Sequence, residues 1–108
     1  MAVHPGEILK DEMEARGLSA NRLALDLGVP SGRITDILNS KRGISPDTAL
    51  RLGRYFGNSP RFWLNLQTAF DLAQETNRKG ERIARLRTIE GQPRDPVLDG
   101  IKQVFASR

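Results

Sequence analysis

Side chains of the kinds that contact nucleic acid gather in one segment, GVPSGRITDILNSKRG at 28–43. An arginine can donate two hydrogen bonds to guanine, and hydroxyl or amide side chains can contact bases or phosphates. Aspartate repels phosphate, so we expect Asp36 either to accept a hydrogen bond from a cytosine amino group or to pair with Arg33. The candidates for contact with DNA bases are Ser31, Arg33, Thr35, Asp36 and Asn39.

Basic and amide residues on either side of this segment predict contacts with the DNA backbone. The adjacent pair Lys41 and Arg42 follows the polar segment directly, and Asn21 precedes it by about one helix length. Cationic and amide side chains at the two ends of a base-contacting helix commonly hold phosphates. We therefore expect Asn21, Lys41 and Arg42 to bind phosphate. The alternative is a solvated helix with an incidental basic loop.

These side chains need two helices that cross steeply. A helix-turn-helix requires a small residue where the helices touch and a glycine at the turn, and Ala24 and Gly28 meet these requirements four residues apart. It also requires apolar residues that lock the second helix onto the first. The residues at these positions are Leu23, Leu27, Val29, Ile34 and Ile37. Seven agreements at fixed spacing predict a DNA-recognition helix running from Ser31 to about Asn39, with its polar edge outward.

The remaining sequence predicts an all-α domain of five helices, with no strand alternation. Serine caps and prolines mark the helix starts, and glycines mark the ends. The predicted helices run from Pro5 to Gly17, from Ser19 to Gly28, from Ser31 to about Asn39, from Ser45 to about Gly57, and from Ser59 to about Glu75. Residues 1–75 form the predicted DNA-binding and dimerisation domain. Residues 76–108 form a basic C-terminal extension that we expect to be irregular or partly helical.

The fifth helix has too many large apolar residues for one face. The spacing i, i+4, i+7, i+8, i+11 predicts a buried face made of Phe62, Leu66, Ala69, Phe70 and Ala73. We expect the opposite face to pair with a second subunit through Trp63, Leu64 and Leu72, with Gln67 at its edge. The alternative is a single small core that wraps around several sides of this helix.

Composition limits the other classes of function. The formal charge is +4, and the whole excess lies in residues 76–108, which carry eight Lys or Arg and four Asp or Glu. There are no cysteines, and no apolar run approaches the roughly 20 residues that cross a bilayer. The acidic N-terminus is unlike a secretory signal, so we expect a cytoplasmic protein with no membrane partner.

Catalysis and metal binding have little support in the sequence. His4 is the single histidine, and we expect it to cap the first helix or to lie at the surface. No cluster of His, Asp and Glu has catalytic spacing, and no glycine loop could cradle phosphate. We therefore expect no enzyme activity, no metal and no cofactor. An enzyme that acts on nucleic acid, such as a nuclease, is an alternative to a DNA-binding regulator. Glu7, Asp11, Glu12 and Glu14 form either a solvated face or a contact surface for a basic protein.

Three segments resemble the HigA-type antitoxins, a branch of the Cro/λ-repressor-like (XRE) helix-turn-helix proteins. They are HPGEIL at 4–9, GVPSGRITDILNSKRGISPDTALRL at 28–52 and FGNSPRFWLNLQTAFDL at 56–72. The resemblance implies a five-helix λ-repressor-like fold and a homodimeric repressor that binds a palindromic operator of its own operon. It also implies a partner, a HigB-like toxin that cleaves mRNA and that the antitoxin neutralises. A stand-alone transcriptional regulator with no toxin is the alternative. Residues 76–108 match no pattern of this family.

Overall fold

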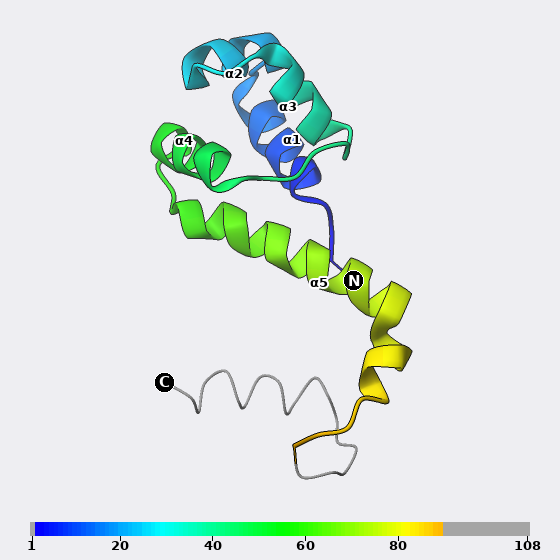
Figure 1. The fold of residues 1–108 in the computed structure, drawn as a ribbon. Helices are drawn as coiled ribbons and strands as arrows, with labels where there is room; N and C mark the ends of the chain where they lie inside the picture. The colour runs from blue at the N-terminus through cyan, green and yellow to red at the C-terminus, as the bar shows by residue number, and fades with distance from the viewer. Residues whose placement is uncertain (1, 90–108) are drawn as a thin grey trace. The chain divides into compact units, whose positions relative to one another are not determined.

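The computed structural model describes residues 2–89, and five α-helices with no strand account for the regular structure in this range (Figure 1). They are α1 (Pro5–Arg16), α2 (Ala20–Leu27), α3 (Ser31–Leu38), α4 (Pro46–Phe56) and α5 (Pro60–Ala84). The predicted five-helix, all-α fold is confirmed. Residues 90–108, most of the C-terminal extension that the sequence predicts to be irregular or partly helical, lie outside the described residues. The chain divides after Ala73 into two units, which are described separately.

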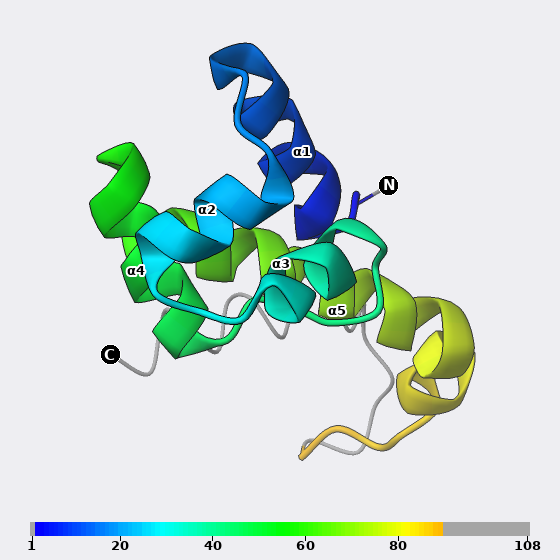
Figure 2. The same ribbon diagram turned by 90° about the horizontal axis from the view of Figure 1, so that it is seen from above.

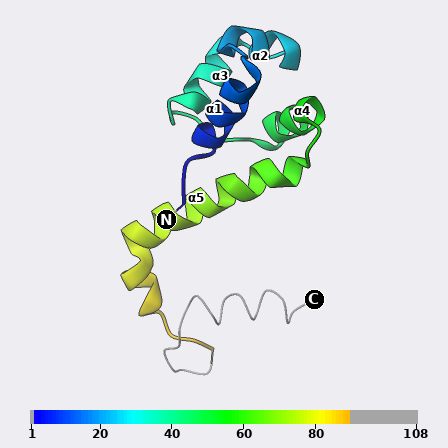
Figure 3. The ribbon, with the colours of Figure 1, turned by 180° about the vertical axis from the view of Figure 1, so that it is seen from behind.

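The first unit is a cluster of short helices. α2 packs against both α3 and α4, and α1 packs against α3. Figure 2 shows α2 and α3 crossing, and Figures 1 and 3 show α4 beside the first turns of α5. None of the helices among residues 2–89 is both long and apolar enough to cross a membrane.

Side-chain caps explain why the helices begin where they do. The His4 ring accepts a hydrogen bond from the backbone N–H of Gly6 at 2.9 Å, as its predicted capping role requires. The hydroxyls of Ser19 and Ser45 accept from backbone N–H groups three residues further on. Each bond satisfies a donor that the first turn of a helix leaves unpaired. The predicted serine and histidine caps are confirmed.

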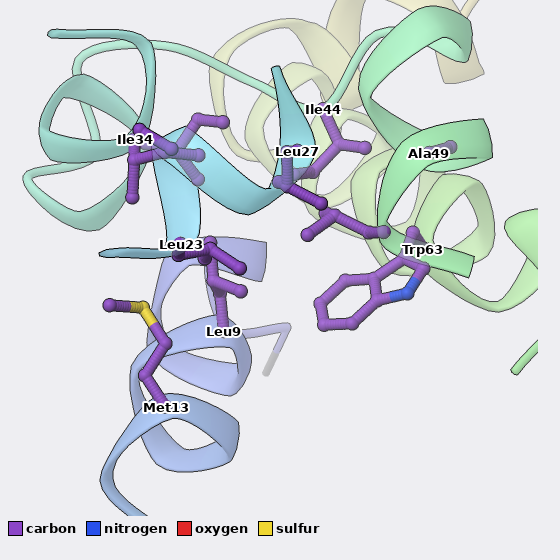
Figure 4. Packing of buried hydrophobic residues seen from close by; sticks show 11 residues of the cluster. Leu9, Met13, Leu23, Leu27, Ile34, Ile44, Ala49 and Trp63 are labelled. Carbon is purple, nitrogen blue, oxygen red and sulfur yellow. The ribbon is translucent and has the colours of Figure 1, made fainter. Parts of the chain in front are cut away.

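The hydrophobic core is formed by residues from all five helices (Figure 4). Leu9 and Leu23 face one another, Met13 lies at one edge, and Trp63 enters the cluster from α5. The large side chains of this core that are fully buried include Leu9, Leu23, Ile34, Ile37, Leu52 and Trp63. Burying a side chain of this size contributes about 1.5–3 kcal/mol, so this cluster is the main source of stability.

The buried face of α5 differs from the one predicted. Trp63 is 0% exposed within a single chain, and its indole N–H donates to the Asn58 side chain at 2.9 Å. Phe62 is 42% exposed and Ala69 is also exposed. The expected inward positions of Phe62 and Ala69, and the expected dimer contact of Trp63, are therefore wrong. Trp63 offers the larger apolar area, and Asn58 satisfies its one donor, so burying Trp63 is the better solution.

Helix α5 also continues nine residues beyond the predicted end at Glu75. In the second unit Glu75 pairs with Arg78 at 3.1 Å and with Lys79 at 3.5 Å. Pairs at i, i+3 and i, i+4 favour the helix. The sequence becomes more basic from Thr76 onwards, but it has no proline before residue 93. The change in composition therefore does not end the helix.

Close contact between α1 and α3 explains the glycine of the HPGEIL segment. A Cβ on Gly6 would overlap the backbone carbonyl of Ile37 and would lie 3.0 Å from the His4 ring. The His4 ring also packs edge-to-face on Phe70, with 4.9 Å between the ring centroids. The start of α1 therefore packs against α3 through Gly6 and against α5 through His4.

Replacing Gly6 by alanine should destabilise the fold by about 1–3 kcal/mol, because the backbone carbonyl of Ile37 cannot rotate away as a side chain would. Gly32→Ala is the matched control, since a Cβ on Gly32 meets nothing within 4 Å. The control should be neutral or more stable by up to about 1 kcal/mol. The free energy of unfolding in urea measures both. Equal midpoints for the two variants would contradict the close contact.

Candidate nucleic-acid interface

The α2–α3 hairpin has the helix-turn-helix geometry that the sequence predicts. Ala24 is buried at the crossing, and Gly28 ends α2 with a left-handed backbone at φ +72°. The backbone N–H of Val29 donates to the Ala24 carbonyl at 3.0 Å, which closes the turn. The locking residues Leu23, Leu27, Ile34 and Ile37 are buried, and Val29 is half-buried against them.

The outer edge of α3 is available to a ligand. Ser31, Gly32, Thr35 and Asn39 are all exposed. The Thr35 hydroxyl donates to the Ser31 and Gly32 carbonyls at 3.3 and 3.2 Å, so its oxygen keeps the capacity to accept a hydrogen bond from a ligand. This edge begins at the N-terminus of α3, where recognition helices contact base edges.

A surface hollow of 410 Å³ joins α2 to the beginning of α3. Asn21 and Ser31 line it together with Ala24, Leu25 and Val29. Asn21 is exposed and lies beside the N-terminal end of α3, where the structure brings it to the same hollow as Ser31. This places two of the predicted DNA contacts together.

Arg33 is held by a partner that the sequence does not reveal. Its Nη1 donates to Asp47 Oδ2 on α4 at 2.9 Å, and Arg51 Nε donates to the same oxygen at 3.0 Å. Hydrogen bonds from Arg51 and then from Arg33 outweigh desolvation and lower the pKa of the Asp47 carboxyl. Arg33 and Asp47 are fourteen residues apart, so no helical spacing connects them.

Asp36 pairs with Arg42 rather than with Arg33. The distance from Arg42 Nη2 to Asp36 Oδ2 is 3.9 Å, which corrects the suggested Asp36–Arg33 pair. The preceding turn fixes the backbone of this loop, because Ser40 adopts φ +60° and the Lys41 N–H donates to the Asp36 carbonyl at 2.8 Å. A non-glycine residue in this conformation is strained, and such strain commonly occurs at functional loops.

A side chain of α5 holds the other end of the basic loop. Gln67 Oε1 accepts from the Ile44 backbone N–H at 2.7 Å, and Gln67 Nε2 donates to Asp71 at 2.9 Å. A Cβ on Gly43 would lie 2.7 Å from the Gln67 amide, so glycine leaves room for this bond. The Gln67 amide is therefore used within the chain, whereas the sequence predicts it at the edge of a dimer interface.

The remaining candidates for subunit contact differ in exposure. Leu64 is half-buried and packs against the core, whereas Leu72 is 63% exposed. Phe62, Ala69 and Leu72 lie at i, i+7 and i+10, so the three exposed residues share one face of α5. This exposed stripe contains Leu72 of the predicted contact face but not Trp63, which is buried.

The described residues contain no group of three His, Cys, Asp or Glu side chains that could hold a metal ion.

The acidic residues Glu7, Asp11 and Glu14 are exposed on α1, and Glu12 pairs with Arg16 at 3.2 Å.

Comparison with known proteins agrees with this geometry. The helix-turn-helix family model HTH_3 matches residues 9–63. Virulence-associated protein I of Dichelobacter nodosus is 56% identical over 72 residues, which cover 66% of this chain and 67% of that protein.

Two solved structures share both the fold and much of the sequence. The addiction module antidote protein of the HigA family from Coxiella burnetii is 47% identical, with a TM-score of 0.78 over 82% of this chain and 98% of that one. The antitoxin HigA of Pseudomonas aeruginosa, solved with the higBA promoter, is 41% identical, with a TM-score of 0.79 over 82% and 99% of the two chains. The chain belongs to the helix-turn-helix family, in its HigA antitoxin branch.

Proposed function

We propose that this protein is the antitoxin of a toxin–antitoxin pair and that it represses its own operon by binding a palindromic operator as a homodimer. The observation that carries this proposal is the exposed polar edge of α3, locked onto α2 by buried Ile34 and Ile37. A helix docked in this way fits the DNA major groove. The related antitoxin from Pseudomonas aeruginosa, which was solved with promoter DNA, supports it.

Within the proposed interface, the residues have two roles. Ser31, Arg33, Thr35 and Asn39 contact base edges, with Asp36 beside them. Lys41 and Arg42 on the strained loop bind phosphates, and Asn21 binds a phosphate at the N-terminal end of α2. Gly32 has open space around it, so the α3 backbone can approach the DNA closely there.

The proposed dimer forms through the exposed face of α5. Phe62 and Leu72 together present apolar side chains to solvent on the first unit. A second copy related by a two-fold axis would cover them and would present two α3 helices to one face of the duplex. Leu64 then supports this face from below, since it packs against the core.

The proposed partner is a HigB-like ribonuclease toxin. The name of the Coxiella burnetii relative, an addiction module antidote protein, supports this part of the proposal. The exposed carboxylates of α1 offer a surface of the charge that a basic, RNA-binding enzyme would meet favourably.

Lys41→Ala and Arg42→Ala should each weaken binding to a palindromic and to a scrambled duplex alike. Each should also flatten the dependence of log K on log salt by about one unit for every phosphate that a subunit no longer binds. Lys10→Ala removes a charge that is also exposed, but on α1, and should leave both quantities unchanged. Fluorescence titration at several salt concentrations measures this. A change in base preference without a change in slope would show that these residues do not bind phosphate.

Leu72→Asp should convert the dimer to a monomer that remains folded, because it places a charge in a face that the second subunit covers. Leu25→Asp is the control, since Leu25 is a leucine on α2 that is 74% exposed, somewhat more than Leu72. Sedimentation velocity at micromolar concentration gives the oligomeric state, and circular dichroism shows whether each variant is folded. A Leu72→Asp dimer would place the interface elsewhere.

If a toxin is encoded beside this gene, as the proposal requires, co-expression of the two proteins should suppress mRNA cleavage, and they should co-purify. Primer extension on a reporter mRNA measures the cleavage. If the mRNA is cleaved at full rate despite the presence of this protein, the antitoxin role is wrong. Operator binding in the same preparation would then favour the stand-alone regulator.

A further inference from the structure

One carboxylate connects α3 to α4 at the N-terminal end of the recognition helix, and an arginine bound to it extends the connection to α2. Asp47 lies in the first turn of α4 and accepts hydrogen bonds from Arg33 on α3 and from Arg51 on α4. Arg51 Nη1 in turn donates to the Leu27 carbonyl at 2.8 Å, at the last residue of α2. We name Arg33, Asp47 and Arg51 the arginine clasp.

Stability alone does not account for the clasp. The Asp47 side chain is 55% exposed and that of Arg51 is 42% exposed, and ion pairs in water contribute little to folding. The clasp does, however, restrict the guanidinium of Arg33, the one arginine on α3. Arginine loses much rotamer freedom when it binds, so a side chain that is already oriented binds at a lower entropic cost.

The clasp leaves Arg33 able to contact a base. A guanidinium carries five N–H donors in a fixed fork, and the bond to Asp47 involves a single Nη1 donor. The remaining donors include pairs that match the O6 and N7 acceptors of guanine. Arg33 is 28% exposed, so part of the group faces solvent.

We propose that Asp47 is a specificity-determining residue, which acts by orienting Arg33 towards a guanine in each half-site. The inference rests on the proposed DNA binding and extends it to a residue outside the helix-turn-helix hairpin. Asp47 does not touch the base; it positions the side chain that does. Because its negative charge opposes DNA phosphates, its effect on specificity is opposite to its effect on affinity for random sequence.

This opposition separates a positioning role from a structural one. Removing the Asp47 charge should lower the preference for guanine and should leave binding to random DNA unchanged or tighter. If Asp47 only stabilised the fold, its loss would weaken binding to all duplexes equally. If Arg33 only linked α3 to α4, replacing either residue would not change base preference.

The test uses the full-length protein and the duplex that the wild type selects from a random pool. Variants of that duplex change one base pair at a time, and a scrambled duplex reports random binding. Asp47→Asn should lower discrimination at one base pair per half-site about tenfold. Asp26→Asn is the matched control, because it removes the same charge from a carboxylate that also has two partners. Asp26 pairs with Arg22 of α2 at 3.3 Å and accepts from the Tyr55 hydroxyl of α4 at 2.7 Å.

Two further variants keep the outcome interpretable. Arg33→Ala should lose discrimination at the same base pair, and the Arg33→Ala, Asp47→Asn double variant should lose no more than Arg33→Ala alone. Arg33→Lys keeps the charge but loses the fork, so it should bind random DNA normally without the guanine preference. This variant tests Arg33 independently if Asp47→Asn is poorly folded, as its thermal melting would show.

The opposing results are distinct. An unchanged base profile for Asp47→Asn, or an equal loss on selected and scrambled duplexes, would overturn the role of Asp47. An unchanged profile for Arg33→Lys would overturn the role of Arg33 in guanine contact. If the wild type selects no duplex from the pool, the proposed function itself fails.

Discussion

The burial of Ile34 and Ile37 determines how the rest of the DNA-binding surface is arranged. Both side chains are fully buried three residues apart on α3, so the helix has one possible rotation about its axis. Every polar residue between them and beside them then takes a fixed direction. The backbone carbonyl of Ile37 also lies against Gly6 of α1. Ile37 therefore determines the distance between α1 and α3 as well.

The loop after α3 depends on contacts from both of its ends. At one end, Ser40 adopts a strained conformation. At the other end, Gln67 of α5 accepts a hydrogen bond from the Ile44 N–H. Lys41 and Arg42 lie between these two anchors. Helix α5 also carries the exposed face proposed for dimer contact. If the subunits join there as proposed, the Gln67 side chain would connect dimer contact with phosphate contact.

Local patterns in the sequence predict the helices and the hairpin well, because caps, turns and apolar periodicity act within a few residues. Ser19, Gly28 and Ser45 are examples whose roles follow from their immediate neighbours. The pairs Arg33–Asp47 and Ile44–Gln67 are separated by 14 and 23 residues, and no local spacing predicts them. The prediction of which face of α5 is buried was wrong for a similar reason. Whether Phe62 or Trp63 is buried depends on Asn58 and on the space that the other helices leave.

Two arginines proposed to contact DNA are each paired with a carboxylate in the free chain. Arg33 binds Asp47, and Arg42 lies 3.9 Å from Asp36. Exposed pairs of this kind have free energies of roughly 0–1 kcal/mol, so a phosphate can displace Asp36 from Arg42 at little cost. In the role proposed for Asp47, this carboxylate keeps its hydrogen bond to Arg33 while the other donors of the guanidinium contact guanine. The carboxylates nevertheless reduce the net positive potential that random DNA meets. In the proposed roles, the acidic residues beside the recognition helix would favour discrimination between sequences at the expense of affinity, which would suit a regulator that must find one operator among many competing sites.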